Sequence, residues 1–475
     1  MTEQIFEVRD IVAFTERTAV AFEPNQTWPG ATYVALDLPW FDGHEHVVSA
    51  VKAGASSIVI DSKRMLQVRQ HLREEELDTR IFPVASSLAA FRGIARAKFA
   101  QRTVDAIVVA GSAGKTTTRR LLAEMLERAL GPILESRDNQ NGFFGVAATA
   151  LRLRPEHRVA LLEVGIDATG AMDDHLDLIR PDSSILTAIG YEHLGGLRDI
   201  DTIFAEQRLV IDRVAANGGI VAVNLDDPLL ATLGREIGNH RPLIGYTLSK
   251  RKGAIASHIE ILEGSYSPSN DYMIVNGLGL RRFRLPLPLP GAHNARNVLG
   301  ALALARSYGA SGEHARMALT DFRPLPGRSE LKELSSGTRL ICDYFNASPL
   351  SMQSALELLN ESADSGSGVR WACLGDMLDL GDKTCDLHRA LAPILVKSNV
   401  DHVLLFGDAM ACLADELRFI GFAGRVRHFD CIDQLAAAVH SGVAKNANKD
   451  SVLIKGSRAM KMERVETFLQ TSDLR

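Results

Sequence analysis

The chain has 475 residues, of which 46% are hydrophobic and 23% charged, and its formal net charge is −5. These values are ordinary for a globular protein of about three domains, and the acidic balance argues against a nucleic-acid-binding protein. No apolar run reaches the roughly 18 residues of a membrane-spanning helix, and the acidic N-terminus differs from a signal peptide. We therefore expect a cytoplasmic protein. Because it has five cysteines and no Cys-x-x-Cys pair, we expect reduced thiols rather than disulfides or a zinc site.

The first hundred residues alternate short β-branched runs with helical patterns. The expected strands are 32–36, 57–60 and 81–84, and the expected helices are 47–53 and 88–99. The last helical pattern ends just before Val104. We therefore predict an α/β domain over residues 1–103.

The rest of the chain repeats this alternation twice, which is typical of parallel, doubly wound sheets. A proline- and glycine-containing stretch at 324–327 separates the two parts. The sequence thus predicts three consecutive α/β domains: 1–103, a central phosphate-loop domain over 104–325 with a mostly parallel sheet, and a Rossmann-like domain over 326–475. The expected strands are 106–110, 159–164, 184–189, 219–224, 340–343, 372–374, 402–406 and 451–455, and the expected C-terminal helices are 351–359 and 388–396.

A glycine-bracketed loop follows the strand at 106–110 and leads into a helical pattern. Glycines let backbone N–H groups turn inward, and a helix start attracts anions, so this arrangement predicts a phosphate site. Lys115 would neutralise the outer phosphates, and the Thr116 hydroxyl would hold Mg²⁺. Val109 stands where the usual motif has its first glycine, and an ordinary turn is the alternative. The loop residues are Gly111, Ser112, Ala113, Gly114, Lys115, Thr116 and Thr117.

Two more metal-ligand candidates lie at the carboxyl ends of expected strands, where ligands collect in open α/β sheets. Glu163 ends one strand, and His193 follows another. Taken alone, Glu163 is better explained as a solvent-facing charge and His193 as a loop residue, and only together with Lys115 and Thr116 do they indicate a shared Mg–ATP site. His193 is the weaker candidate, because Mg²⁺ takes nitrogen ligands seldom.

Two asparagine-rich segments and one basic segment are further binding candidates. Asn139 and Asn141 follow the phosphate-loop helix, and Asn294 and Asn297 open a later one. Asparagine suits an adenine edge or a substrate amide, but it also favours turns and helix caps. The segment 455–458 follows the last strand and suits an anion such as a carboxylate.

Together these segments resemble the Mur ligases, ATP-dependent enzymes that form amide bonds in peptidoglycan assembly. Further segments resemble the branch that adds D-alanyl-D-alanine to UDP-MurNAc-tripeptide, and the Asp-Asn-Pro-Arg motif of another branch is absent. The resemblance covers all three expected domains. Its segments are 111–118, 139–141 with Gly145, 163–165, 193–194 and 291–297, and for the branch 42–44, 54–55, 343–352, 374–381 with His388, and 455–463.

The resemblance implies a mechanism in which ATP phosphorylates a carboxylate and an amine then displaces phosphate from the acyl phosphate. It implies ATP and Mg²⁺ as cofactors, and UDP-MurNAc-peptide and D-Ala-D-Ala or analogues as substrates. We expect a monomer without nucleic-acid or membrane partners. The implied catalytic residues are Lys115, Glu163 and His193; the metal ligands are Thr116, Glu163 and His193; ATP is bound by the loop with Asn294, Asn297, Arg328 and Asp343; the substrates are bound by Asp42, Asn139, Asn141, Lys455, Ser457 and Arg458.

Four departures from the family pattern affect the second metal and the substrate side. Gln207 stands where the family has a lysine carbamylated by CO₂, and we hypothesise that Glu206 supplies the missing charge; an alignment slip is the alternative. The other departures are Thr15-Glu16-Arg17, Ala188 and the segment 342–349. They leave two alternatives open: a similar ligase that joins a different acid and amine outside cell-wall synthesis, and a non-catalytic nucleotide-binding protein.

Overall fold

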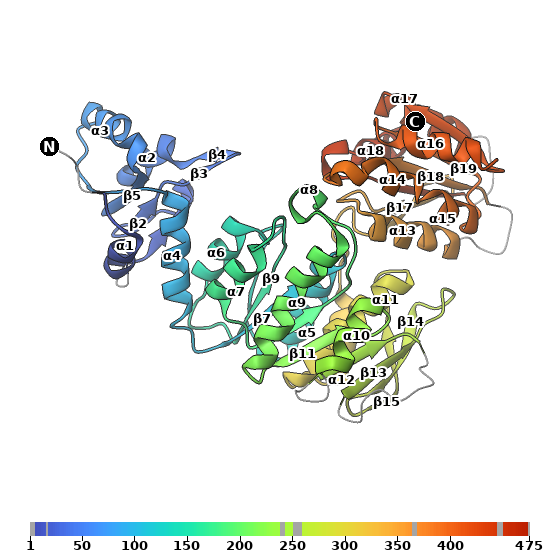
Figure 1. Cartoon of the computed structure of the whole chain (residues 1–475), viewed down its shortest axis with the longest axis horizontal. Coiled ribbons are helices and arrows are strands. Elements are labelled where there is room, and N and C mark those ends of the chain that lie inside the picture. Colours follow the sequence, from blue (N-terminus) through green and yellow to red (C-terminus); the bar gives the residue numbers. More distant parts are fainter. Residues whose placement is uncertain are drawn as a thin grey trace. The chain divides into compact units, whose positions relative to one another are not determined.

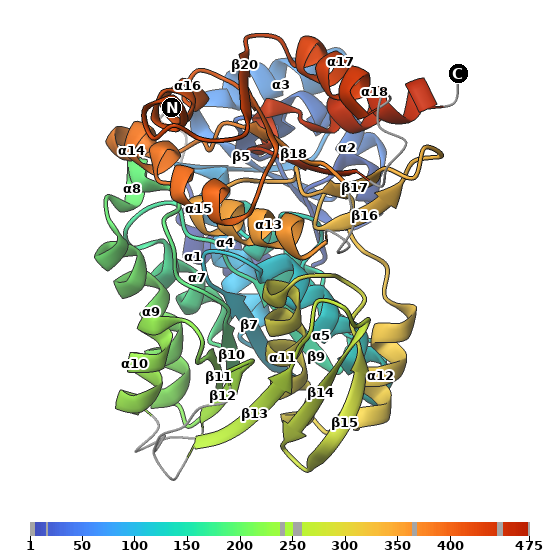
Figure 2. The ribbon, with the colours of Figure 1, turned by 90° about the vertical axis from the view of Figure 1, so that its right-hand side faces the viewer.

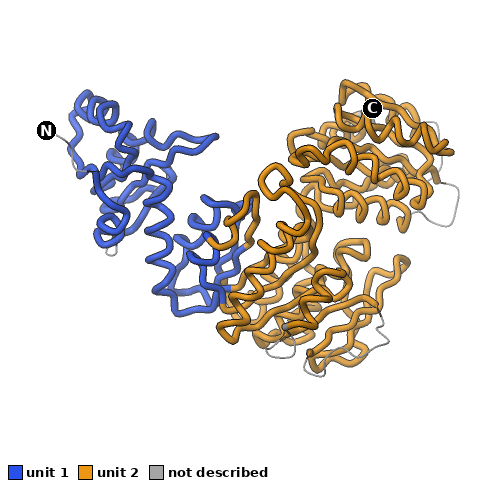
Figure 3. Tube along the Cα trace, in the orientation of Figure 1, with its two compact units in different colours: residues 1–106, 134–162, 174–181 blue, residues 107–133, 163–173, 182–475 orange. Residues whose placement is uncertain are grey.

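Figure 1 shows a computed structural model of the chain, which describes residues 5–15, 18–237, 243–249, 259–362, 368–443 and 450–473. Contacts divide it into unit 1 (1–106, 134–162 and 174–181) and unit 2 (107–133, 163–173 and 182–475), coloured in Figure 3. The predicted domain boundaries after residues 103 and 325 stay predictions. Glu16 and Arg17 lie outside the described residues. Among the helices that are described, none is long and apolar enough to cross a membrane.

Unit 1 contains a four-stranded parallel sheet in the order β1-β2-β5-β6. The sequence predicted three of these strands, and β1 was missed because it is only two residues long. The helix α4 (Ser87–Phe99) begins at the N-cap Ser86, whose hydroxyl accepts the Ala89 N–H at 3.2 Å. The other elements are β1 Val20–Ala21, β2 Thr32–Val34, β5 Ser57–Asp61, β6 Arg80–Val84, α1 Val8–Thr15, α2 Val47–Lys52, α3 Met65–Glu74, the hairpin β3 Asp37–Leu38 and β4 Phe41–Asp42, β8 Leu134–Glu135, and α6 Phe143–Leu151.

Within the described residues, the central sheet has nine strands and is mostly parallel, as predicted. Its strands in unit 2 run in the order β15-β14-β13-β12-β11-β10-β7, and β13, β14 and β15 pair antiparallel. The sequence did not predict this antiparallel edge, because β15 carries three arginines and lacks a continuous apolar run. The strands are β7 Asp105–Ala110, β9 Val159–Glu163, β10 Ser183–Leu186, β11 Ile220–Asn224, β12 Leu243–Thr247, β13 Ile259–Ser265, β14 Tyr272–Gly277 and β15 Leu280–Pro286.

Helices cover both faces of this sheet, so its central strands are buried on both sides. Figure 2 shows α9 (Ile200–Ala216) and α10 (Pro228–Ile237) on one face, and α5 (Lys115–Leu130), α11 (Ala292–Ser307) and α12 (Gly312–Asp321) on the other. Two further helices are α7 (Ala171–Ile179) and the short α8 (Leu194–Leu197).

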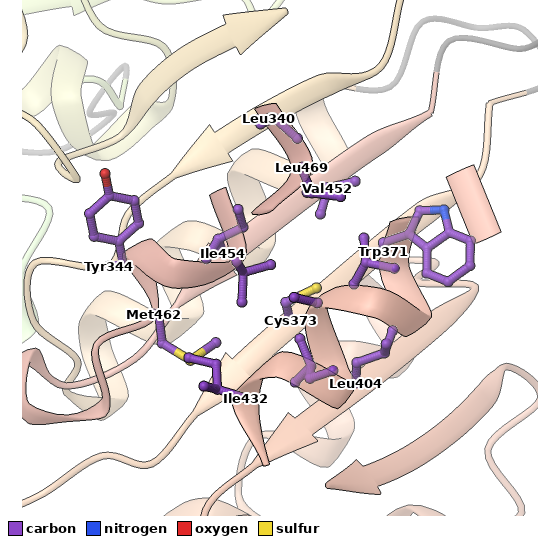
Figure 4. Packing of buried hydrophobic residues seen from close by; sticks show 14 of the residues in the cluster. Leu340, Tyr344, Trp371, Cys373, Leu404, Ile432, Val452, Ile454, Met462 and Leu469 are labelled. Carbon is purple, nitrogen blue, oxygen red and sulfur yellow. The ribbon is translucent and has the colours of Figure 1, made fainter. Parts of the chain in front are cut away.

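A second sheet of unit 2 has the order β16-β17-β21-β18-β19-β20, with only β16 antiparallel. Alternate residues of its strands, such as Leu340, Cys373 and Ile454, pack against the helices α17 (Ile432–Val443) and α18 (Glu463–Asp473), which contribute Ile432 and Leu469 in Figure 4. This period of two is expected for side chains on one face of a strand. The elements are β16 Glu330–Glu333, β17 Arg339–Cys342, β18 Arg370–Gly375, β19 His402–Phe406, β20 Arg425–Phe429, β21 Ser451–Lys455, α13 Pro349–Glu361, α16 Met410–Phe419, α17 Ile432–Val443 and α18 Glu463–Asp473.

The helix predicted over 388–396 is wrong in its bounds. The chain forms α14 (Thr384–Arg389) and α15 (Ala392–Lys397) instead. Pro393 lies in the first turn of α15, where a missing N–H costs nothing, whereas the interior of a longer helix would lose a hydrogen bond there.

The expectation of five reduced thiols is also wrong. Cys385 of α14 and Cys412 of α16 form a disulfide, with Cα atoms 5.5 Å apart, while Cys342, Cys373 and Cys431 are free. The two cysteines are 27 residues apart in the chain, so no local spacing motif indicated that they pair.

Candidate active site

The phosphate loop joins β7 to α5, and two of its glycines are required by its geometry. Gly111 and Gly114 have φ angles of 121° and 84°, which favour glycine. A Cβ at Gly111 would lie 2.3 Å from the Thr187 Oγ1, and one at Gly114 would lie 2.5 Å from the Asn297 Oδ1. The Thr187 hydroxyl also donates to the Ala113 carbonyl at 2.6 Å, which fixes the curvature of the loop.

The loop has the groups that a polyphosphate requires. The Ser112 Oγ is buried and has no hydrogen-bond partner, so it can accept or donate to a bound oxygen. Lys115 is the first residue of α5, where backbone N–H groups and the helix dipole attract anions. Its Nζ donates to the Gly111 carbonyl at 2.5 Å, so the charge lies over the loop.

Glu163, at the end of β9, lies beside the start of α5. Its Oε1 accepts the Thr116 hydroxyl at 3.0 Å, and its Oε2 accepts the Arg119 Nε at 3.2 Å, with both side chains of this ion pair 2% exposed. A carboxylate and a hydroxyl at a phosphate loop are suitable ligands for Mg²⁺, which takes its remaining oxygens from phosphate and water. The described residues contain no group of three or more His, Cys, Asp or Glu that could hold a metal by themselves.

The sequence missed Glu192, which the structure brings to the phosphate loop. Its Oε2 lies 3.3 Å from the Lys115 Nζ, and its Oε1 accepts the Gln207 Nε2 at 3.2 Å. The Gln207 Oε1 in turn accepts the Gly111 N–H at 3.0 Å. Glu192 is next to His193, so the signal was present in the sequence, but a metal-ligand interpretation favoured the histidine.

His193 faces a different partner. Its Nδ1 lies 3.2 Å from the Asp379 Oδ2, and its side chain is 40% exposed. Its role as a metal ligand stays a prediction.

The hypothesis that Glu206 supplies the missing charge stays a prediction, and the structure shows each of its oxygens accepting one backbone N–H. Oε1 accepts the Gly170 N–H at 2.8 Å and Oε2 the Met172 N–H at 3.2 Å, so the carboxylate holds the start of α7. On α9 it is Gln207 that faces the phosphate loop.

The two asparagines of α11 lie behind the loop in a hydrogen-bonded chain. The Asn297 Oδ1 accepts the Thr118 hydroxyl at 3.3 Å, and its Nδ2 donates to the Asn294 Oδ1 at 3.2 Å. The Asn294 Nδ2 donates to the Pro290 carbonyl at 2.7 Å. These contacts tie α11 to α5, and the predicted contacts with adenine stay predictions.

Asp343 is the centre of a second polar cluster. Its Oδ1 accepts the Ser329 N–H at 2.9 Å, and its Oδ2 accepts the Lys455 Nζ at 2.6 Å. Loss of water around the His293 ring, which lies 3.2 Å from the Ser329 Oγ, lowers the pKa of His293 to about 4, against the opposing charge of Asp343. Burial also lowers the pKa of Arg328, against the opposing charges of Glu163 and Asp343.

Lys455 does not have the free ammonium expected of a carboxylate-binding residue. Its Nζ donates to the Asp343 Oδ2 at 2.6 Å, the Asp343 carbonyl at 3.2 Å and the Asn346 carbonyl at 3.0 Å, which uses all three hydrogens. The buried Ser457 hydroxyl accepts the Leu378 N–H at 2.9 Å. Arg458 is 60% exposed and keeps donors for a ligand beside its 3.5 Å contact with Glu463. The predicted roles of these three residues as carboxylate ligands stay predictions, and Arg458 is the most exposed of the three.

Three predicted substrate residues belong to unit 1. Asp42 accepts the His44 N–H at 3.0 Å and the Arg64 NH2 at 2.8 Å, so its carboxylate organises the turn after β4. Asn139 is exposed and Asn141 half-buried in the turn before α6. Their predicted roles are untested.

The class of protein follows from domain comparisons. Residues 109–305 match the Mur ligase middle domain, and residues 327–458 match the Mur ligase, glutamate ligase domain. Together the two matches cover more than half of the chain, which belongs to the Mur ligase family. It is an ATP-dependent amide ligase of this family, as predicted.

Within the family, the chain is similar to UDP-N-acetylmuramoyl-tripeptide–D-alanyl-D-alanine ligases. It is 28% identical to that of Bacillus subtilis over 93% of this chain and 91% of the relative, and 26% identical to that of Escherichia coli over 95% and 93%. Among solved structures, MurF from Acinetobacter baumannii has a TM-score of 0.80 at 22% identity, covering 99% of this chain and 100% of that one. MurF from Thermotoga maritima, solved in complex with ADP, has a TM-score of 0.76 at 22% identity, covering 98% and 99%. These likenesses confirm the predicted fold.

Proposed function

We propose that the protein joins D-alanyl-D-alanine to UDP-MurNAc-tripeptide in peptidoglycan precursor synthesis, as a cytoplasmic, monomeric, Mg²⁺-dependent enzyme. The observation that carries this proposal is the similarity over more than nine-tenths of the chain to ligases named for that reaction. The phosphate loop with Thr116 and Glu163 supports its ATP-dependent part.

In this proposal the residues of unit 2 position ATP for attack by the substrate carboxylate. A carboxylate oxygen attacks the γ-phosphorus, ADP leaves, and the amine then displaces phosphate from the acyl carbon. Phosphoryl transfer requires positioning and neutralisation of charge more than covalent help from the protein. Lys115, Ser112 and the start of α5 would bind the phosphates, with Arg328 nearby. Thr116 and Glu163 would hold Mg²⁺, which neutralises phosphate charge when bound.

The test is a phosphate-release assay with purified protein, ATP, Mg²⁺, UDP-MurNAc-tripeptide and D-Ala-D-Ala. The proposal expects release that depends on both substrates, with the pentapeptide product seen by mass spectrometry. Lys115→Ala is expected to abolish release, and Asp212→Asn, on the exposed face of α9, to leave it unchanged. Phosphate release that does not require the two substrates and forms no pentapeptide would contradict the proposal.

A ligase for a different acid and amine is the second candidate. It is favoured by the segment 342–349, which departs from the family pattern, and by Lys455, whose donors are used within the protein. ATP binding with no turnover of the cell-wall substrates, but phosphate release with another acid and amine, would favour it. ATP binding without turnover of any pair would favour a non-catalytic protein.

A further inference from the structure

We propose that Glu192, oriented by the Gln207 side chain, holds a second divalent cation on the phosphates of bound ATP. This inference rests on the proposed function of the phosphate loop. It replaces the modified lysine expected from the family with two unmodified residues.

Two carboxylates face the phosphate loop from different strands. Glu163 is the last residue of β9 and contacts Thr116, whereas Glu192 lies in the segment after β10 and contacts Lys115. Both are buried, with Glu192 only 7% exposed. The site thus has a carboxylate on the Thr116 side and another on the Lys115 side.

Gln207 fixes the orientation of Glu192 through one continuous set of hydrogen bonds. The Gly111 N–H donates to the Gln207 Oε1, so the amide nitrogen Nε2 is directed at the Glu192 Oε1. The Gln207 side chain is fully buried and therefore has little freedom to turn. An amide nitrogen is not a nucleophile toward CO₂, so this position cannot form a carbamate. The negative charge comes from Glu192 itself.

The Glu192 carboxylate keeps acceptor capacity after these contacts. It has about four lone-pair sites, of which Gln207 and Lys115 each use one. Phosphate oxygens compete with Glu192 for the Lys115 ammonium. A buried carboxylate that shares its cation with several phosphate charges requires further neutralisation, and carboxylate, phosphate and water are the ligands that Mg²⁺ prefers.

The test counts Mn²⁺ bound in the presence of a non-hydrolysable ATP analogue, by electron paramagnetic resonance of the free ion. The wild type is expected to bind a second Mn²⁺, also in CO₂-free buffer. Glu192→Gln keeps the shape but removes the charge, and is expected to weaken that ion about 10- to 100-fold. Asp212→Asn, which removes one charge from the exposed side of α9, is the matched control and is expected to keep it.

The outcomes separate this inference from the proposed function. A wild type that does not bind the ATP analogue contradicts the proposed function. Binding of the analogue with the same Mn²⁺ affinity in Glu192→Gln as in the wild type overturns the inference alone, as does a second ion that appears only with added bicarbonate. Gln207→Leu leaves the Glu192 charge but removes its hydrogen-bond donor, and is expected to weaken the second ion about tenfold. An unchanged affinity would overturn the orienting role of Gln207, and this variant also serves if Glu192→Gln fails to fold.

Discussion

At the scale of single residues, the site is built from buried charges that each need a partner. Glu163 and Arg119 form an ion pair with both side chains 2% exposed, and Lys455 pairs with Asp343 in the second cluster. Removing one member of such a pair leaves an uncompensated charge away from water. The residues proposed to bind ATP, Mg²⁺ or substrate here thus also support the fold.

Glu163→Gln is therefore expected to lower the free energy of unfolding by about 3 kcal/mol, because the Arg119 guanidinium loses its buried counter-charge. Urea denaturation followed by circular dichroism measures the change. Glu313→Gln, whose exposed carboxylate pairs with Arg316, is the control and is expected to change stability by less than about 0.5 kcal/mol. Equal stability of Glu163→Gln and the wild type would show that the pair contributes nothing.

His293 predicts a pH dependence of stability. The folded protein keeps this histidine neutral down to about pH 4, while the unfolded chain protonates it near pH 6.5. The unfolded state then binds more protons in that window, so stability falls as pH drops from about 6.5 to about 4, by about 2–3 kcal/mol. Comparison of His293→Gln with the wild type at several pH values measures this contribution. If the stability of both proteins falls equally as the pH is lowered, the pH dependence comes from groups other than His293.

At the scale of elements, the pattern of apolar residues in the sequence predicted the strands that are buried on both faces of a sheet. It did not predict the strands that are partly exposed. The predicted strands 106–110, 402–406 and 451–455 each contain at least three consecutive apolar residues, and they lie in parallel strands within one residue of the predicted bounds. The strand β15 has exposed arginines, and it joins the sheet through antiparallel pairing with β14, which pairs in turn with β13. The phosphate loop was predictable because its residues are consecutive in the sequence. Glu192 and Gln207 meet only because α9 folds back beside β10.

The helix α5 has a glycine at a positive φ angle at each end, which gives a matched pair of variants. Gly114→Ala would add backbone strain and place a Cβ 2.5 Å from the Asn297 Oδ1, so ADP affinity is expected to fall at least about tenfold. Gly131→Ala adds strain at φ 94° but meets nothing within 4 Å, and is expected to cost only stability. Fluorescence titration with a labelled ADP measures both. Equal ADP affinities of Gly114→Ala and the wild type would contradict the requirement for glycine at this position of the phosphate loop.

At the scale of the molecule, the Cys385–Cys412 disulfide closes a loop in the second sheet region of unit 2. A cross-link spanning 27 residues removes chain entropy from the unfolded state, worth about 3–4 kcal/mol. We therefore expect reduction to lower the free energy of unfolding by about that amount. Thiol titration in denaturant is expected to find three free thiols before reduction and five after it. Five thiols before reduction would contradict the bond, and Cys431→Ala is the control for a free cysteine.

The contact between Lys115 and Glu192 also bears on turnover. ATP does not simply fill a positive site: its phosphates exchange with an acceptor that the protein already supplies. The same carboxylate can recapture the lysine as ADP departs, which lowers the cost of letting the product go. If the proposed function holds, Glu192 would therefore affect how readily a nucleotide is released as well as how it is held.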